Sequence, residues 1–259
     1  MKTVQNTMRR FHLGQAPIDT VGAEEAAHWV NDRAARGLRT SVVPVNAAIV
    51  VLAARHPEIR PTLDAFDLAL ADGFWPAFAT RCLSGADAPH ANTSPFLRAL
   101  FAQSGSTGFR VFLLGGRPEV VEKAAAILPQ LYPEGRVVGH EHGYFDASDE
   151  QRIVDQINAS GASLLLLGMS SPKKEAFVRR NWQRLTVLVS VGVGGAFDIW
   201  AGEIREAPTW VRVSGFEWLF RLSQEPRRLL KRYTIDNMLF LCVVLEQLAH
   251  RVCGRSARQ

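Results

Sequence analysis

Short runs of consecutive apolar residues alternate with amphipathic stretches along most of the chain. The apolar runs cover residues 40–45, 67–71, 109–115, 162–168 and 186–192. Such runs are typical of parallel strands buried on both faces, and the stretches between them have the period of helices. The pattern therefore predicts an α/β fold with a Rossmann-like, mostly parallel sheet and helices on both faces.

Helices are expected at residues 23–36, from about residue 75, at 118–132 and at 172–182. Thr20 is placed to cap the first of these, and Gly37 is placed to end it. Ser170 and Ser171 are placed to cap the last one, with Pro172 as its first residue.

The pattern changes after about residue 207, where the apolar runs stop. We expect residues 1–207 to form the α/β domain and residues 208–259 to form a C-terminal helical appendage. Between residues 221 and 232 the appendage has one acidic residue, Glu225, and five basic residues: Arg221, Arg227, Arg228, Lys231 and Arg232. Apolar residues lie among them, which is typical of a helix that binds an anionic membrane surface. An ordinary amphipathic helix packed on the domain would have the same composition.

The 259 residues carry a formal net charge of +5 at pH 7, which suits an acidic partner. Its placement on the appendage favours a membrane over nucleic acid. The amino terminus lacks the apolar stretch of a signal peptide, and residues 238–245 fall short of the roughly 20 apolar residues that span a bilayer. We therefore expect a cytoplasmic protein that lies on the membrane without spanning it.

The residues that follow each strand are the candidate site residues, because ligands bind beyond the carboxyl ends of parallel strands. Two of these turns hold paired glycines, Gly115-Gly116 and Gly194-Gly195. Paired glycines let backbone N–H groups approach a phosphate, but a tight turn with close helix packing also uses them. Neither turn carries GxGxxG or GxxxxGK[ST], which argues against a dinucleotide cofactor and a P-loop.

Asp72 ends the run at residues 67–71 and precedes Gly73. A carboxylate there faces the crevice, where it could take a proton from an attacking hydroxyl group. It could equally cap the helix expected from about residue 75. Farther along, Lys173 and Lys174 oppose the dipole of the helix they begin, and a bound anion would explain them.

Metal and disulfide sites are not indicated. His140 and His142 lack an identifiable third metal ligand, and the chain has no DxD motif. The three cysteines include no CxxC pair. We expect neither a metal nor a cofactor.

Several segments between about residue 47 and residue 233 resemble the WecG/TagA/CpsF glycosyltransferase family. The likeness is most specific in VSVGVGGAFDIWAGEIREAPTWV, residues 189–211, and in GFEWLFRLSQEPRRLLKRY, residues 215–233. LALADG and LLLLGMSSPKKEAFV add matches in the same order.

The resemblance implies an inverting enzyme of cell-surface polysaccharide synthesis. It would move a sugar from a UDP-linked donor to a glycan on a polyprenyl diphosphate. In the family the Asp of ADG is the proposed base, which is Asp72 here. The appendage is thought to engage the inner face of the cell membrane and complete the site over the diphosphate. The other matching positions are implied substrate contacts: Asn46, Ser171, Lys174, Glu175, Phe197, Asp198, Arg221, Arg227 and Arg232.

Three segments depart from the common family pattern. Pro44-Val45-Asn46 stands in place of the usual Thr-x-Asn, and residues 172–175 (PKKE) stand in place of the usual Pro-Lys-Gln-Glu. Residues 90–96 (HANTSPF) stand in place of a stretch with Arg and Gly-x-Asp. All three lie where substrate should bind, so the sugar can differ from N-acetylmannosamine. The alternative to an enzyme is a peripheral membrane or nucleotide-binding scaffold, which leaves Asp72 and the glycine turns without a role.

Overall fold

The computed structural model describes residues 8–85, 89, 91–105, 108–208, 210–211 and 214–256. For residues 227–229, 231–233 and 252–256 it describes the main chain alone.

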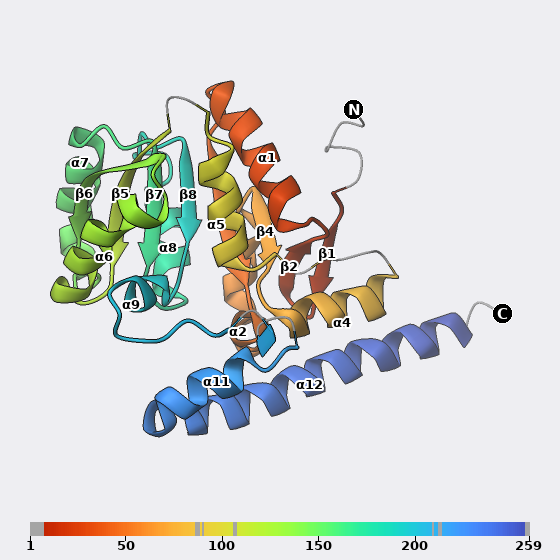
Figure 1. Ribbon diagram of the computed structural model, residues 1–259. Coiled ribbons are helices and arrows are strands. Elements are labelled where there is room, and N and C mark those ends of the chain that lie inside the picture. Colours follow the sequence, from red (N-terminus) through yellow and green to blue (C-terminus); the bar gives the residue numbers. More distant parts are fainter. Residues whose placement is uncertain are drawn as a thin grey trace.

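Strands within these residues form one sheet, in the order β1-β2-β4-β3-β8-β7-β5-β6 (Figure 1). The strands are β1 (Arg10–Leu13), β2 (Ala16–Asp19), β3 (Thr40–Val45), β4 (Leu68–Ala71), β5 (Phe109–Gly115), β6 (Gly135–Glu141), β7 (Leu164–Gly168) and β8 (Val189–Gly192). β1 and β2 pair antiparallel, and the other neighbours pair parallel. The predicted mostly parallel sheet is confirmed, and the five apolar runs are β3, β4, β5, β7 and β8.

Helices cover both faces of the sheet, as predicted. Those before the appendage are α1 (Ala23–Ala35), α2 (Ala47–Arg55), η2 (Pro57–Ile59), α3 (Arg60–Asp64), α4 (Phe74–Ser84), α5 (Thr93–Ala102), α6 (Pro118–Leu131), η3 (Ala147–Asp149), α7 (Glu150–Ala159), α8 (Lys173–Asn181) and α9 (Ala196–Trp200). One core cluster includes α1, α5, α6 and α9, and another includes α2, α4, α7 and α8. Val42 enters the first and Val43 the second. Because successive strand residues point to opposite faces, the clusters lie on opposite sides of the sheet.

The appendage is helical, as predicted, and consists of α11 (Glu217–Gln224) and α12 (Pro226–Ser256). Figure 1 shows α12 running along one end of the sheet, where it packs against α2, α4 and β1. Gln247 fastens α12 to the β1–β2 turn, since its side chain donates to His12 O (2.8 Å) and accepts from Gly14 N (2.9 Å). Among the described residues, no helix has the length and apolar character needed to cross a bilayer.

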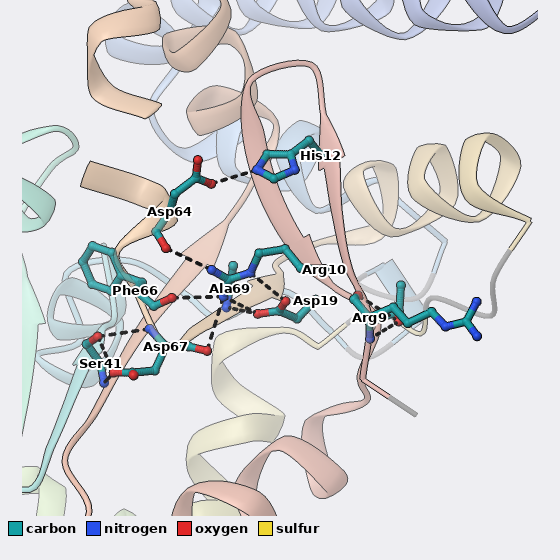
Figure 2. Close-up of polar contacts among 10 residues, drawn as sticks. Arg9, Arg10, His12, Asp19, Ser41, Asp64, Phe66, Asp67 and Ala69 are labelled. Atoms are coloured by element: carbon teal, nitrogen blue, oxygen red, sulfur yellow. Dashed lines mark hydrogen bonds and ion pairs between the residues drawn. The ribbon is translucent and has the colours of Figure 1, made fainter. Parts of the chain in front are cut away.

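The hairpin of β1 and β2 is an element that the apolar pattern did not predict. Only Asp19 and Leu70 are paired in the register of β2 with β4, so side chains secure the hairpin. Figure 2 shows Arg10 forked on Asp19, with Nε and Nη2 donating to the carboxylate at 2.9 and 2.8 Å. Asp19 is buried and also accepts from Ala69 N at 2.7 Å. This carboxylate therefore joins both hairpin strands to β4.

The predicted cap of α1 is wrong, although its predicted end is confirmed. α1 begins after Gly22 without a side-chain cap. Thr20 instead exchanges hydrogen bonds with the main chain of Arg9, which closes the open end of the hairpin. Gly37 has φ 69° just beyond the helix, a left-handed conformation that favours glycine.

Asp19→Ala should lower the free energy of unfolding by about 3 kcal/mol, because it leaves Ala69 N–H without its acceptor and the Arg10 guanidinium with main-chain carbonyl groups alone. Urea unfolding followed by circular dichroism measures the change. Asp32→Ala is the matched control: it removes a carboxylate whose ion pair with Arg36 is more than half exposed, and it should cost less than about 1 kcal/mol. Equal losses in the two variants would contradict a structural role for Asp19.

Candidate active site

A cavity of about 2140 Å³ opens at the carboxyl edge of the parallel strands. Each of five strands contributes the residues that follow it. Asn46 comes after β3, Asp72 after β4, Gly116 after β5, Met169 after β7 and Gly194 after β8. Residues of α11 and α12 line the cavity as well, so the appendage forms part of its wall. This is the edge at which open α/β sheets bind their ligands.

Asp72 is held by the start of α5 and does not cap α4. Its Oδ1 accepts hydrogen bonds from Thr93 N at 3.1 Å and Thr93 Oγ1 at 3.3 Å. The capping alternative for α4 is wrong, because Gly73 is its N-cap and no side chain caps it. Gly73 N donates to Asn92 Oδ1 at 3.0 Å instead.

The segment that departs from the family pattern at residues 90–96 is the one that supports Asp72. Ala91 N donates to Ala71 O at 2.9 Å, and Asn92 and Thr93 then bond Gly73 and Asp72. His90 lies outside the described residues. One sequence signal points to this arrangement: Asn-Thr-Ser before an apolar helical stretch is typical of a helix start. That signal does not indicate which strand end the helix meets.

Opposing influences act on the pKa of Asp72. Burial raises this pKa most, and the nearby carboxylate of Glu217 raises it further. The hydrogen bonds from Thr93 and the charge of Arg221 lower it, and the net result is a raised pKa. Glu217 and Arg221 form an ion pair at 3.2 Å on α11. A carboxyl group with increased proton affinity at a cavity wall is suited to general-base catalysis.

At the Gly115-Gly116 turn, the paired glycines allow two strand ends to meet. Gly115 has φ 137°, and a Cβ atom there would lie 2.4 Å from the carbonyl carbon of Gly168. Gly116 N already donates to Gly168 O at 3.0 Å. Close packing of β5 on β7 thus accounts for Gly115, and the left-handed φ of 68° favours glycine at position 116. A phosphate near this turn would need a different donor.

At Gly194-Gly195, in contrast, the backbone is open to the cavity. Gly194 has φ 53°, and nothing lies within 4 Å of the place where a Cβ atom would be. A Cβ atom on Gly195 would lie 3.6 Å from Arg221 Nη1 and 3.8 Å from Asp198 Oδ2. A ligand can therefore approach this backbone closely and meet the guanidinium of Arg221.

Neither serine caps α8, so that prediction is wrong. Pro172 is the N-cap and no side chain caps the helix. The Ser171 hydroxyl donates to Glu175 Oε1 at 2.8 Å, and Lys174 Nζ contacts Ser171 Oγ and Glu175 Oε1, the latter at 2.7 Å. Lys173 Nζ donates to the carbonyls of Gly143 (2.9 Å) and Phe145 (2.7 Å). These protein partners account for both lysines without a bound anion.

Most of the remaining expected site residues line the cavity, and some do not. Those that do are Asn46, Asp72, Gly116, Ser171, Lys174, Gly194, Gly195, Asp198 and Arg221. Glu175 is turned inward to Lys174. Phe197 is 1% exposed and packs against Gly168, where a Cβ atom would lie 2.3 Å from its ring. The side chains of Arg227 and Arg232 lie outside those described.

Comparison with known families identifies the family of the chain. Residues 11–253 match the profile of the glycosyl transferase WecG/TagA/CpsF family, from the first strand into the last helix. The match includes Asp72, the open glycine turn and α11. The chain therefore belongs to the WecG/TagA/CpsF family of glycosyltransferases, which act in the synthesis of cell-surface polysaccharides.

Proposed function

We propose that this enzyme is an inverting glycosyltransferase that uses a UDP-sugar donor and a glycan acceptor linked to polyprenyl diphosphate. The observation that carries the proposal is Asp72, a carboxyl group of raised pKa on the wall of a cavity large enough for both substrates. A non-enzymatic scaffold would have no use for such a group, and it does not explain the family match.

In the proposed reaction, Asp72 takes the proton of an acceptor hydroxyl as that oxygen attacks the anomeric carbon of the donor. The bond from this carbon to the diphosphate oxygen breaks on the opposite face, so UDP leaves and the configuration inverts. Because Oδ1 already accepts from Thr93, we assign the proton to Oδ2. Asp72 then returns the proton to water. No metal or cofactor is needed to balance this step.

The donor diphosphate fits best at Gly194-Gly195. There the open backbone allows close approach, and the nearby Arg221 offers a positive charge to the leaving diphosphate. Asn46 and Lys174, on the same cavity wall, are proposed contacts to the sugars. Arg227 and Arg232 follow Arg221 along the appendage and are proposed to meet the acceptor diphosphate.

The appendage is proposed to hold the enzyme on the inner face of the cell membrane. One side of α12 packs on the domain through Phe240. The other side exposes an apolar stripe, formed by Ile235, Met238, Leu241, Leu245 and Leu248. The basic residues Arg227, Arg228, Lys231 and Arg232 precede this stripe. Exposed apolar residues next to cations suit the boundary of an anionic bilayer. We retain residues 1–207 as the catalytic domain and 208–259 as the appendage.

A donor screen tests the proposed reaction. Purified full-length protein is incubated with a panel of nucleotide sugars and a synthetic polyprenyl-diphosphate-linked sugar, and products are read by mass spectrometry. A product of opposite anomeric configuration that forms only with UDP-sugars supports the proposal. Retained configuration, or donors other than UDP-sugars, would contradict it.

Asp72→Asn should lower kcat by about 10²- to 10⁴-fold, because it removes the proton acceptor at almost unchanged shape. UDP affinity and the far-UV circular dichroism spectrum should remain as in the wild type. The matched control is Glu203→Gln, an acid on the same cavity wall that is bound by Lys123 at 2.9 Å. A variant at Asp72 that keeps more than about a third of the turnover would remove the base from this mechanism.

The acid limb of the pH profile of kcat/KM should move in opposite directions in two variants. The base acts when ionised, so activity rises through its pKa. Glu217→Gln removes a charge that raises this pKa, and the limb should move to lower pH. Thr93→Val removes a hydroxyl donor that lowers it, and the limb should move to higher pH. Asp32→Asn, on the exposed side of α1, should leave the limb in place. Shifts in a common direction would show that another group controls it.

Leu241→Glu combined with Leu245→Glu should reduce sedimentation with anionic liposomes at low salt by more than about tenfold, because charged groups replace apolar ones in the stripe. Leu38→Glu serves as the control. Leu38 is exposed before the amino end of β3, at the sheet edge opposite the cavity. Unchanged sedimentation of the double variant would mean that the stripe does not face the bilayer.

A further inference from the structure

An aromatic surface is exposed at the start of α4, directly after the candidate base. Trp75 and Phe78 are 43% and 47% exposed. Phe74 and Phe78 stack with ring centroids 5.6 Å apart, and the Trp75 ring stands edge-on to both, at 5.2 and 6.2 Å. We name these residues, Phe74, Trp75 and Phe78, the aromatic shelf. Exposed aromatic clusters of this kind mark binding surfaces more often than structural ones.

Contacts with the chain before α11 fix the orientation of the shelf. Trp75 Nε1 donates to Gly215 O at 3.2 Å. Phe74 packs so closely on Gly215 that a Cβ atom there would lie 2.8 Å from its ring. Since the indole N–H already has its acceptor, Trp75 presents ring carbon to its surroundings. Phe216, which follows Gly215 in the chain, is half exposed as well.

The shelf begins inside the site and continues outside it. Phe74 and Trp75 line the same cavity as Asp72, and only Gly73 separates them from it in the chain. Phe78 lies about 6 Å farther along the axis of α4. Gly194, where we place the donor, follows β8, which is separated from β4 by β3. A molecule that reaches Asp72 along α4 therefore crosses the shelf and stays clear of the donor.

We propose that the aromatic shelf binds the polyprenyl chain of the acceptor. This inference rests on the proposed function. The acceptor must bring a hydroxyl to Asp72 while its hydrocarbon chain leaves the cavity. A branched hydrocarbon has no hydrogen-bonding groups, so ring carbon whose one N–H is already bonded satisfies it fully, whereas a sugar stacked on the same rings would still need polar partners for its hydroxyl groups. A bilayer surface would meet the outer residue, Phe78, but would not reach Phe74 on the cavity wall.

The test compares acceptors that share one head group and carry either a long polyprenyl chain or a single short prenyl unit, assayed in detergent. Phe78→Ala and Trp75→Ala should each raise KM for the long-chain acceptor by about tenfold. Each variant removes an aromatic side chain of which roughly half is exposed and can contact the chain. For the short-chain acceptor, Phe78→Ala should change KM less than about twofold, because that chain does not reach Phe78 outside the cavity. Trp75→Phe should restore most of the affinity, and Leu38→Ala is the control for an exposed apolar residue elsewhere.

Other occupants give other outcomes. If Phe78→Ala weakens sedimentation with acceptor-free vesicles and leaves KM in detergent unchanged, the shelf contacts the bilayer and the proposal is overturned. If the variant instead shifts a concentration-dependent dimer to monomer, the occupant is a second copy, which also overturns it. A wild-type enzyme that shows no preference for chain length overturns it directly.

A binding experiment separates failure of this inference from failure of the proposed function. Polyprenyl diphosphates without sugar, long and short, are titrated into full-length protein while tryptophan fluorescence is followed. One outcome is that the long chain binds more tightly than the short one, that Phe78→Ala abolishes this difference, and that the protein transfers no sugar to any lipid-linked acceptor. This outcome would support binding of the chain by the aromatic shelf and would refute the proposed function. Sugar transfer with equal KM for the long-chain and short-chain acceptors would support the proposed function and refute binding of the chain by the aromatic shelf.

Discussion

The parallel register of the sheet is the constraint on which the site depends. Parallel strands all end at one edge, so residues far apart in the chain meet there. Asp72 at the end of β4 and Gly194 at the end of β8 are brought to opposite sides of β3 in this way. The proposed base and the proposed donor site therefore face one cavity without a dedicated loop to join them. The helices on both faces fix this register by burying alternate strand residues.

Two turns that look alike in the sequence have different surroundings. Gly115-Gly116 and Gly194-Gly195 both follow apolar strands, and both could be interpreted as phosphate turns. The difference comes from the neighbouring strand end: β7 ends against Gly115, whereas the space beside Gly194 is open. Sequence patterns predicted five strands of the sheet (β3, β4, β5, β7 and β8), the layers and the cavity edge, because periodicity reports burial. They could not separate the two turns, because close approach between strand ends is a tertiary contact.

The same limit explains the other errors. Thr20 and Ser171 are good N-cap residues by composition, but each found a different partner in the fold, Arg9 in the hairpin and Glu175 within α8. The hairpin was missed because β1 and β2 are short and are stabilised by the polar contacts of Arg10 and Asp19. For Thr20 a hydrogen bond across the hairpin replaced the predicted cap, whereas Ser171 bonds the side chain of a residue four positions on in place of a main-chain N–H group.

Asp72 draws its chemical character from three separate regions. β4 carries it to the cavity and α5 orients its carboxylate through Thr93. α11 supplies Glu217 and Arg221, which act on its proton affinity in opposite directions. Because α11 and α12 belong to the appendage, the base has this environment only when the appendage is packed against the domain. If the apolar stripe of α12 binds a bilayer, that contact bears on the same helices that line the cavity. Attachment to the membrane and the proton affinity of the base are then linked through one structural element, and this gives the appendage a chemical role in addition to an anchoring one.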